Sequence, residues 1–180
     1  MRFYEKPTGA DRRHVLTPED IEVVLERLPP ETYVRLRAIH FVDRSRGGRV
    51  LGYVTGGRRE ISLCALPPRV SLTRFLCGTQ SARTFGARRG QQWPELAVRR
   101  FMLYDVFLHE LGHLQIVDPK ARSNRRYYAH ETLAQRFADE WRKELWSRPS
   151  DHPDPVHDPP TASELAQLKP TGSPAQNANA

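Results

Sequence analysis

Cysteine is scarce in this chain, whose 180 residues include Cys64 and Cys77 and no other cysteine. A secreted domain held together by disulfides needs a denser, evenly paired set, and a zinc knuckle needs Cys-x-x-Cys pairs. Neither pattern is present, which excludes a disulfide framework and a cysteine-based metal site. We expect each cysteine to serve as a small hydrophobic residue of the core.

Long hydrophobic runs are also missing. No apolar stretch reaches the roughly 20 residues that a transmembrane helix requires. The first nine residues lack the apolar segment that is typical of a signal peptide. We therefore expect a soluble, cytoplasmic protein, and the length indicates one domain with a modest core.

Acidic residues are outnumbered by basic ones. The chain has 28 lysines and arginines against 21 aspartates and glutamates, so its formal net charge is +7 at pH 7. The basic residues are dispersed, and no zinc finger, RRM or helix-turn-helix pattern accompanies them. A solvated basic surface accounts for this charge, and binding to nucleic acid or to acidic partners is the alternative.

Hydrophobic periodicity indicates one α+β domain over residues 17–148. Residues 17–28 begin with a threonine cap and a proline, which is typical of a helix start. Three strand candidates follow, each bounded by turn residues, at 33–42, 50–54 and 60–66. Because the turns between them are short, we expect a small antiparallel sheet.

Two longer helices are predicted after these strands. The first covers residues 94–117, and its apolar residues occupy more than one face, so we expect it to be buried. The second covers about residues 128–146. Outside the domain, residues 1–16 show little periodicity and are expected to be irregular. Residues 149–180 are rich in Pro, Ala, Ser, Thr and Asn, and we expect a disordered tail apart from a weak turn near residues 162–168.

The predicted buried helix carries the sequence His-Glu-Leu-Gly-His at residues 109–113. Two histidines four residues apart lie on the same face of a helix, so His109 and His113 can bind one zinc ion. Glu110 can then reach a water molecule on that metal and act as a general base. Three titratable groups on a buried helix would be costly without a partner, which favours a metal site.

A catalytic zinc requires three protein ligands and an open position for water. The last predicted helix offers two candidates for the third ligand, His130 and Glu131. At about 100° per residue, they flank the apolar stripe of this helix on opposite sides, so both side chains could point inward. A carboxylate at the start of an apolar face needs a partner, and a zinc ion is a suitable one.

The His-Glu-x-x-His motif followed by Glu131-x-x-Ala134 resembles the gluzincin metallopeptidases, in which two histidines and a downstream glutamate bind zinc. The following Phe137-Ala138 is similar to the small ImmA/IrrE-like bacterial peptidases. The resemblance implies a zincin-like α+β fold, in which a small sheet packs on the motif helix and on a third-ligand helix. It also implies zinc-dependent hydrolysis of peptide bonds in a peptide or protein substrate.

The resemblance implies specific roles for four residues. His109, His113 and Glu131 would hold the zinc ion, and Glu110 would be the catalytic base. The small Ala134 would let the two helices approach each other closely.

Several further residues are candidates for supporting roles. Gly112 would let the edge strand of the sheet, expected at 60–66, approach the metal helix, and that edge could bind a peptide by strand addition. Asp105 lies one turn before His109 and could orient its imidazole. Donors to the oxyanion are expected nearby in the sequence. The candidates are Tyr127, Tyr128 and His130.

Two other classes of function are compatible with the sequence. One is a zinc-stabilised binding or regulatory protein without turnover, and the other is a basic protein associated with nucleic acid. The presence of Glu110 favours hydrolysis, because a structural zinc site needs no base.

Overall fold

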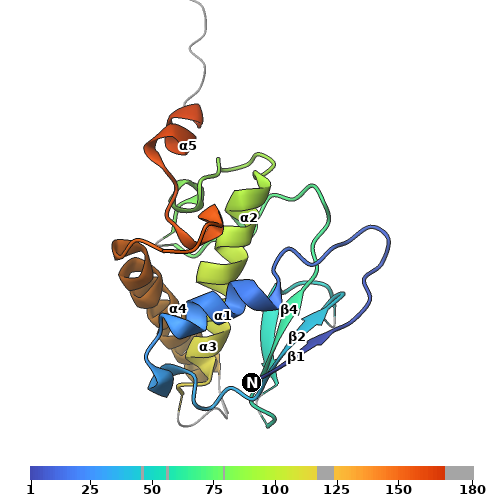
Figure 1. Ribbon diagram of the computed structural model, residues 1–180. Helices are drawn as coiled ribbons and strands as arrows, with labels where there is room; N and C mark the ends of the chain where they lie inside the picture. Colours follow the sequence, from blue (N-terminus) through green and yellow to red (C-terminus); the bar gives the residue numbers. More distant parts are fainter. Residues whose placement is uncertain (46, 56, 79, 117–123, 169–180) are drawn as a thin grey trace, which may run out of the picture.

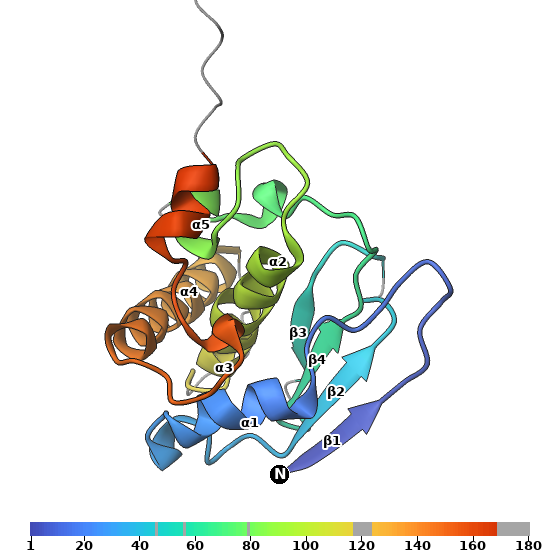
Figure 2. The ribbon, with the colours of Figure 1, turned by 45° about the horizontal axis from the view of Figure 1, so that its top comes forward.

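The computed structural model describes residues 1–45, 47–55, 57–78, 80–116 and 124–168. For residues 124–127 it describes the backbone and not the side chains. It shows an α+β domain with a four-stranded sheet and several helices, in agreement with the predicted class. Figures 1 and 2 show the sheet on one side of the molecule and the helices gathered on the other.

The sheet is mixed, so the prediction of an antiparallel sheet holds for β3 and β4 and is wrong for the other pairs of strands. It consists of β1 (Arg2–Glu5), β2 (Ala38–Val42), β3 (Gly52–Thr55) and β4 (Glu60–Cys64), in the order β1-β2-β4-β3. β1, β2 and β4 are parallel to one another, and β3 runs antiparallel to β4. Residues 1–16 were expected to be irregular, but they contribute β1 to this sheet.

Burial explains the strand order. Ile39 and Phe41 of β2 and Ile61 and Leu63 of β4 are at most 2% exposed, so these two strands lie in the centre. β1 and β3 carry mostly exposed or half-buried side chains and form the edges. The chain passes from β1 to β2 through α1 (Pro18–Glu26), and a helical crossover of this kind joins parallel strands.

The predicted start of α1 is confirmed. The side chain of Thr17 accepts a hydrogen bond from the backbone N–H of Asp20, and the Asp20 carboxylate accepts one from the N–H of Thr17. This capping box satisfies two backbone donors that a helix start would otherwise leave without partners. The buried face of α1 includes Ile21, Val24 and Leu25.

A continuous helical segment crosses the centre of the molecule. It consists of α2 (Glu95–Phe101), a π-helical turn (Met102–Phe107) and α3 (Leu108–His113). All side chains from Phe101 to Leu108 are at most 8% exposed. The predicted burial of this helix is therefore confirmed.

The longest helix of the described residues, α4 (Asn124–Ser147), packs along α3. No helix in this part of the chain is both long and apolar enough to cross a membrane. Shorter 3-10 turns lie between the larger elements, at Pro30–Thr32, Thr73–Phe75, Ala82–Phe85 and Pro155–His157.

Residues 149–168 differ from the expected disordered tail. α5 (Ala162–Gln167) is a short helix where a weak turn was expected, and Val156, in the part expected to be disordered, is completely buried in the core. The composition of residues 149–168 is poor in apolar residues, but they supply partners to the buried guanidinium group of Arg100. The last part of the predicted tail, residues 169–180, lies outside the described residues.

Candidate metal centre

Two neighbouring helices supply the residues of the candidate site. α3 places His109 and His113 one turn apart, and α4 places Glu131 beside them. The helices are close because Gly112 has no side chain: a Cβ there would lie 2.9 Å from the carbonyl oxygen of Ala134 and 3.0 Å from its Cα. Gly112 thus makes room for α4, and its predicted role of admitting an edge strand is wrong.

The three side chains form a compact triangle. Nε2 of His109 lies 3.1 Å from Nε2 of His113, and the carboxylate oxygens of Glu131 lie 3.3 and 3.4 Å from these two nitrogens. In a tetrahedron with bonds of about 2.0–2.1 Å, typical of zinc, ligand atoms stand roughly 3.3 Å apart. The observed distances match this spacing, so the group could hold one metal ion.

Glu131 completes this group, whereas its neighbour His130 does not. Among the described residues, the side chains close enough to share an ion are those of His109, His113 and Glu131. Hydrogen bonds from the two histidines hold the pKa of Glu131 well below its usual range, so its side chain is a carboxylate. Burial lowers the pKa of His109, but the contacts with Glu131 and the charge of Glu110 outweigh it and raise that pKa.

Gln135 orients the first histidine, a role that the sequence analysis does not assign. Its Oε1 accepts a hydrogen bond from Nδ1 of His109 at 3.0 Å. Its Nε2 donates to Oδ1 of Asp105 at 3.0 Å and of Asp139 at 3.3 Å. Because ionised carboxylates accept but do not donate, they fix the amide with its oxygen toward the imidazole. Nδ1 of His109 then carries a proton, and Nε2, which faces Glu131 and His113, is the nitrogen that could bind a metal once its own proton has left.

Asp105 therefore contacts His109 through Gln135, and not directly as the sequence predicts. It contacts Gln135, and its Oδ1 also accepts hydrogen bonds from Nη1 of Arg142 at 3.0 Å and from the amide of Gln80. Burial raises the pKa of Asp105, and these donors counteract that effect. The sequence does contain a feature that could have indicated the role of Gln135, because this residue follows Glu131 by four positions and so lies on the same face of the helix.

Glu110 lies beside the triangle, on the side of α3 that faces the sheet. Its side chain is 7% exposed, and burial raises its pKa to about 7, although the two neighbouring histidines lower it. β3 passes directly against this carboxyl group, since a Cβ on Gly52 would lie 3.0 Å from Cγ of Glu110. A carboxyl group with this pKa can both accept and release a proton near neutral pH.

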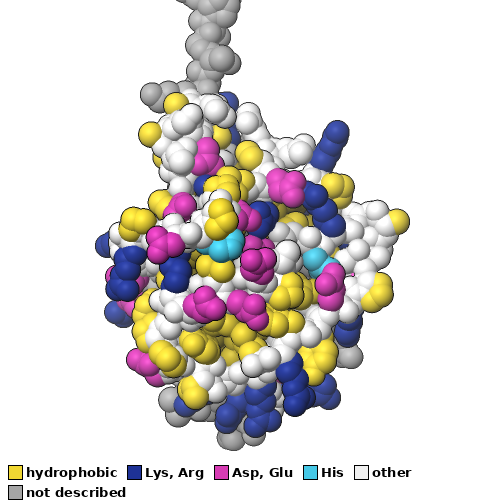
Figure 3. All heavy atoms as spheres, viewed as in Figure 1, with side chains coloured by type: hydrophobic (Ala, Val, Ile, Leu, Met, Phe, Trp, Pro, Cys, Tyr) yellow, Lys and Arg dark blue, Asp and Glu magenta, His cyan; other side chains and the backbone are white. Residues whose placement is uncertain are grey.

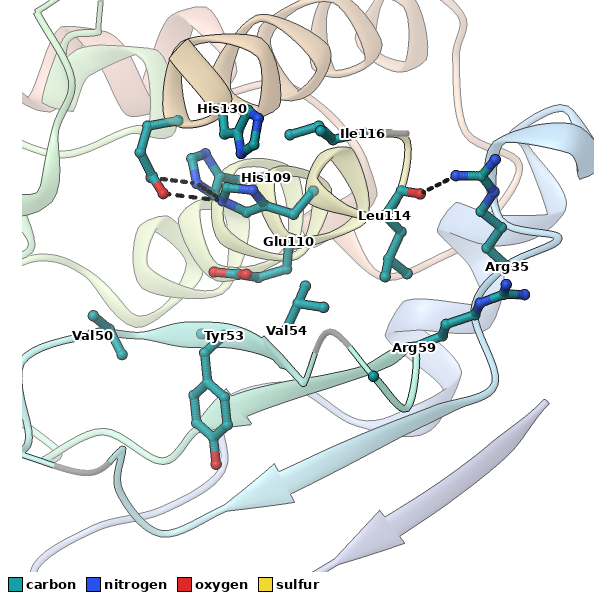
Figure 4. Close-up of a pocket in the computed structure, with 14 residues that line it drawn as sticks. Arg35, Val50, Tyr53, Val54, Arg59, His109, Glu110, Leu114, Ile116 and His130 are labelled. Atoms are coloured by element: carbon teal, nitrogen blue, oxygen red, sulfur yellow. Dashed lines mark hydrogen bonds and ion pairs between the residues drawn. The ribbon is translucent and has the colours of Figure 1, made fainter. Parts of the chain in front are cut away.

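A cleft of about 640 Å³ opens between β3 and the two metal-site helices. Figure 4 shows His109 and Glu110 on one wall and Val54 on the strand opposite, while the hydroxyl group of Tyr53 points away from the cleft. β3 is the last strand in the sheet order, so one of its backbone edges is not paired within the sheet. The edge strand at the site is thus β3, and not the predicted strand at 60–66, which lies between β2 and β3.

The structure distinguishes between the three oxyanion donors that the sequence suggests. His130 lines the cleft, whereas Tyr128 is 68% exposed and is not among the described residues that line it. The side chain of Tyr127 lies outside the described residues.

The two cysteines differ in their environments. Cys64 is buried, as predicted. Cys77 is exposed, so its prediction as a core residue is wrong, and its Sγ donates a hydrogen bond to Oε1 of Gln135 at 3.3 Å.

Comparison with known proteins identifies no relative of this chain. No family model matches it, and neither the curated proteins nor the solved structures include a significant match. The resemblance to the gluzincins therefore depends on the motif residues of the sequence alone.

Proposed function

We propose that this chain is a zinc-dependent metallopeptidase with a zincin-like core. The observation that carries the proposal is the presence of three features in one cleft. These are the metal-ligand triangle, the buried carboxyl group of Glu110 and the unpaired edge of β3. A structural zinc site needs no base, and its fourth position is usually closed by a protein ligand. Here the three ligands line an open cleft and a base lies beside them, which supports catalysis over a structural role.

When bound, zinc would lower the pKa of water toward neutrality and polarise the carbonyl group of the scissile bond. Glu110 accepts the proton of the attacking water and later delivers it to the nitrogen of the leaving amine. Its pKa of about 7 suits both steps. Gln135 holds the imidazole of His109 in the orientation and tautomer that binding requires.

The edge of β3 provides a binding surface for an extended peptide. β3 pairs with β4 along one edge, and its residues Gly52, Tyr53 and Val54 border the cleft. A peptide that adds to this edge makes backbone hydrogen bonds with the strand and passes in front of Glu110. Backbone pairing of this kind positions a peptide bond near the metal ligands without requiring a particular side chain.

Metal analysis and one substitution test the proposal. Protein purified without chelator should contain one zinc ion per chain. Glu110→Gln should keep the zinc and lose hydrolysis of a peptide digest. The exposed Glu140, which pairs with Arg136 on α4, provides the control, because Glu140→Gln should retain both properties. A site that stays empty when zinc is added, or full hydrolysis by Glu110→Gln, would refute the proposal.

The identity of the third ligand can be tested separately. Glu131→Ala should weaken zinc binding much more than His130→Ala, because only Glu131 belongs to the triangle of described ligands. Competition with a chromogenic chelator measures both affinities. The opposite ranking would assign the third ligand to His130.

A further inference from the structure

Two arginines at one end of the cleft lack an acidic partner. Arg35 and Arg59 line the same cleft as the metal ligands, and both are exposed. Neither forms an ion pair with any residue that the structure describes. Among the described residues, the carboxylates that line the cleft are those of Glu110 and Glu131, and both belong to the candidate metal centre. The two guanidinium groups are therefore available to a ligand.

The backbone holds these two arginines next to each other. The N–H of Arg37 donates to the carbonyl oxygen of Arg59 at 3.0 Å, which joins the segment before β2 to the turn after β3. Nη1 of Arg35 donates to the carbonyl oxygen of Leu114 at 3.2 Å, just after the metal helix. Figure 4 shows both side chains beyond Leu114, at the end of the cleft opposite to Val50.

The surroundings of the two arginines are also basic. In the view of Figure 1, Figure 3 shows lysine and arginine side chains gathered at the lower end of the molecule, near the lower ends of the strands. Arg37 and Arg58, which lie close to Arg35 and Arg59 in the sequence, are exposed as well. This concentration of positive charge attracts anionic groups, and the attraction weakens as salt is added.

The geometry points to a carboxylate-binding subsite, in which Arg35 and Arg59 bind an aspartate or glutamate side chain of the peptide substrate. This inference rests on the proposed peptidase function. β3 runs from Gly52, beside Glu110, toward the turn that carries Arg59. Antiparallel pairing of strands is more stable than parallel pairing. A peptide that pairs antiparallel to β3 has its N-terminal residues at the end of the cleft where the two arginines lie. The enzyme therefore prefers substrates with an acidic residue on the N-terminal side of the scissile bond.

Cleavage of a peptide library, followed by mass spectrometry of the products, tests this preference. The wild type should cut peptides with an acidic residue N-terminal to the scissile bond about tenfold more efficiently than glutamine-containing equivalents, as expected for a charge-assisted hydrogen bond. The preference should shrink in high salt and be largely lost in Arg35→Gln and Arg59→Gln. Cleavage without such a preference, or a preference that both variants retain, would overturn the inference and leave the peptidase proposal intact.

Two further variants separate recognition from misfolding. Arg69 is exposed, lies outside the cleft lining and forms no ion pair with a described residue. Arg69→Gln therefore changes the net charge by the same amount as Arg35→Gln or Arg59→Gln, and it should keep the preference for acidic peptides. Arg59→Glu should shift the preference toward lysine-containing peptides. Damage to the fold cannot produce such a reversal, whereas an unchanged preference in Arg59→Glu would count against the subsite.

A binding measurement decides the matter if the wild type cleaves nothing, which would refute the peptidase proposal. Fluorescent peptides that differ by one glutamate-to-glutamine exchange are titrated with the zinc-loaded Glu110→Gln protein. About tenfold tighter binding of the glutamate peptide would support the subsite, provided that the difference disappears when the Arg59→Gln substitution is introduced into the same protein. Equal binding of the two peptides would overturn it.

Discussion

At the scale of single residues, Gln135 links the candidate metal ligands to the charged residues of α4. Hydrogen bonds lead from His109 to Gln135 and on to Asp105, and Arg142 binds that carboxylate at 3.0 Å. Rotation of the imidazole would break the first of these bonds and leave the amide oxygen without its strongest donor. Partners of this kind increase metal affinity because they fix the ligand before the metal arrives.

Replacement of this glutamine should weaken metal binding while the ligands stay in place. For Gln135→Ala we expect zinc affinity to fall about 10–100-fold, since His109 loses its hydrogen-bond partner. Competition with a chromogenic chelator measures the loss, and Gln91→Ala, at an exposed position, serves as the control. An unchanged affinity would show that His109 is oriented without the amide.

A second residue-scale prediction concerns the pH dependence of stability. His157 is completely buried, its Nδ1 lies 3.2 Å from the hydroxyl oxygen of Tyr104, and its Nε2 has no hydrogen-bond partner among the described residues. Burial lowers the pKa of His157 in the folded state, and the nearby His152 contributes to this effect. The unfolded chain therefore takes up a proton at a higher pH than the folded one, and acid should favour unfolding.

For the wild type we expect the free energy of unfolding to decrease as the pH falls through the ordinary pKa of histidine. The decrease should be smaller for His157→Asn, because asparagine does not titrate there. Denaturant titrations at several pH values, with chelator present throughout, give the two curves. Parallel curves would mean that His157 does not contribute to the acid sensitivity.

At the scale of elements, the site depends on two close approaches of backbone to a neighbouring element. Gly112 allows α4 to lie against α3, and Gly52 allows β3 to lie against Glu110. The contact at Gly112 is the less tolerant one, because the nearest atoms belong to the backbone of Ala134 and cannot rotate away. Helix spacing therefore controls the distance between Glu131 and the two histidines.

A methyl group at this contact should disturb both stability and metal binding. For Gly112→Ala we expect a loss of about 1–3 kcal/mol in the free energy of unfolding, which is typical of overpacking, together with weaker zinc binding. Gly78→Ala is the control, since a Cβ at Gly78 meets nothing within 4 Å. Equal stability and zinc affinity of the two variants would contradict this interpretation of the helix contact.

Local sequence signals predicted most elements but not how the strands pair. The cap of Thr17, the branched residues of β2 and the apolar periodicity of the central helix are local features, and each indicated an element that the structure contains. The pairing depends on which strands are buried on both faces. The short turn between β3 and β4 does join neighbouring strands, but β4 is inserted between β2 and β3, so the turn after β2 did not indicate a neighbour. The edge strand at the site was mispredicted for the same reason.

At the scale of the whole molecule, residues 149–168 connect regions that are distant in the sequence. The guanidinium group of Arg100 is 1% exposed and binds the Glu164 side chain and the carbonyl oxygens of Pro155 and Asp158. Asp154 binds Arg99 at 2.8 Å. The central helix thus depends on this segment for the partners of a buried charge.

Removal of this segment should destabilise the protein, contrary to the expectation from composition. A chain that ends at residue 148 should lose about 3 kcal/mol or more relative to one that ends at residue 168, because Arg100 is left without its partners. Thermal or denaturant unfolding of the two truncated chains provides the comparison, and their difference reports on residues 149–168 alone. Equal stability would show that these contacts contribute nothing.

The sequence by itself determined the ligand spacing of His109 and His113, the burial of their helix and the position of Glu110 beside them. These properties follow from the period of a helix and from the distribution of apolar residues along one segment. Only the tertiary structure distinguished Glu131 from His130 as the residue that lies with the two histidines. It also showed the hydrogen bond between Gln135 and His109. It showed further that β3 borders the cleft, with Arg35 and Arg59 at one end. These relations join segments far apart in the chain, and they depend on packing between elements, which local periodicity does not encode.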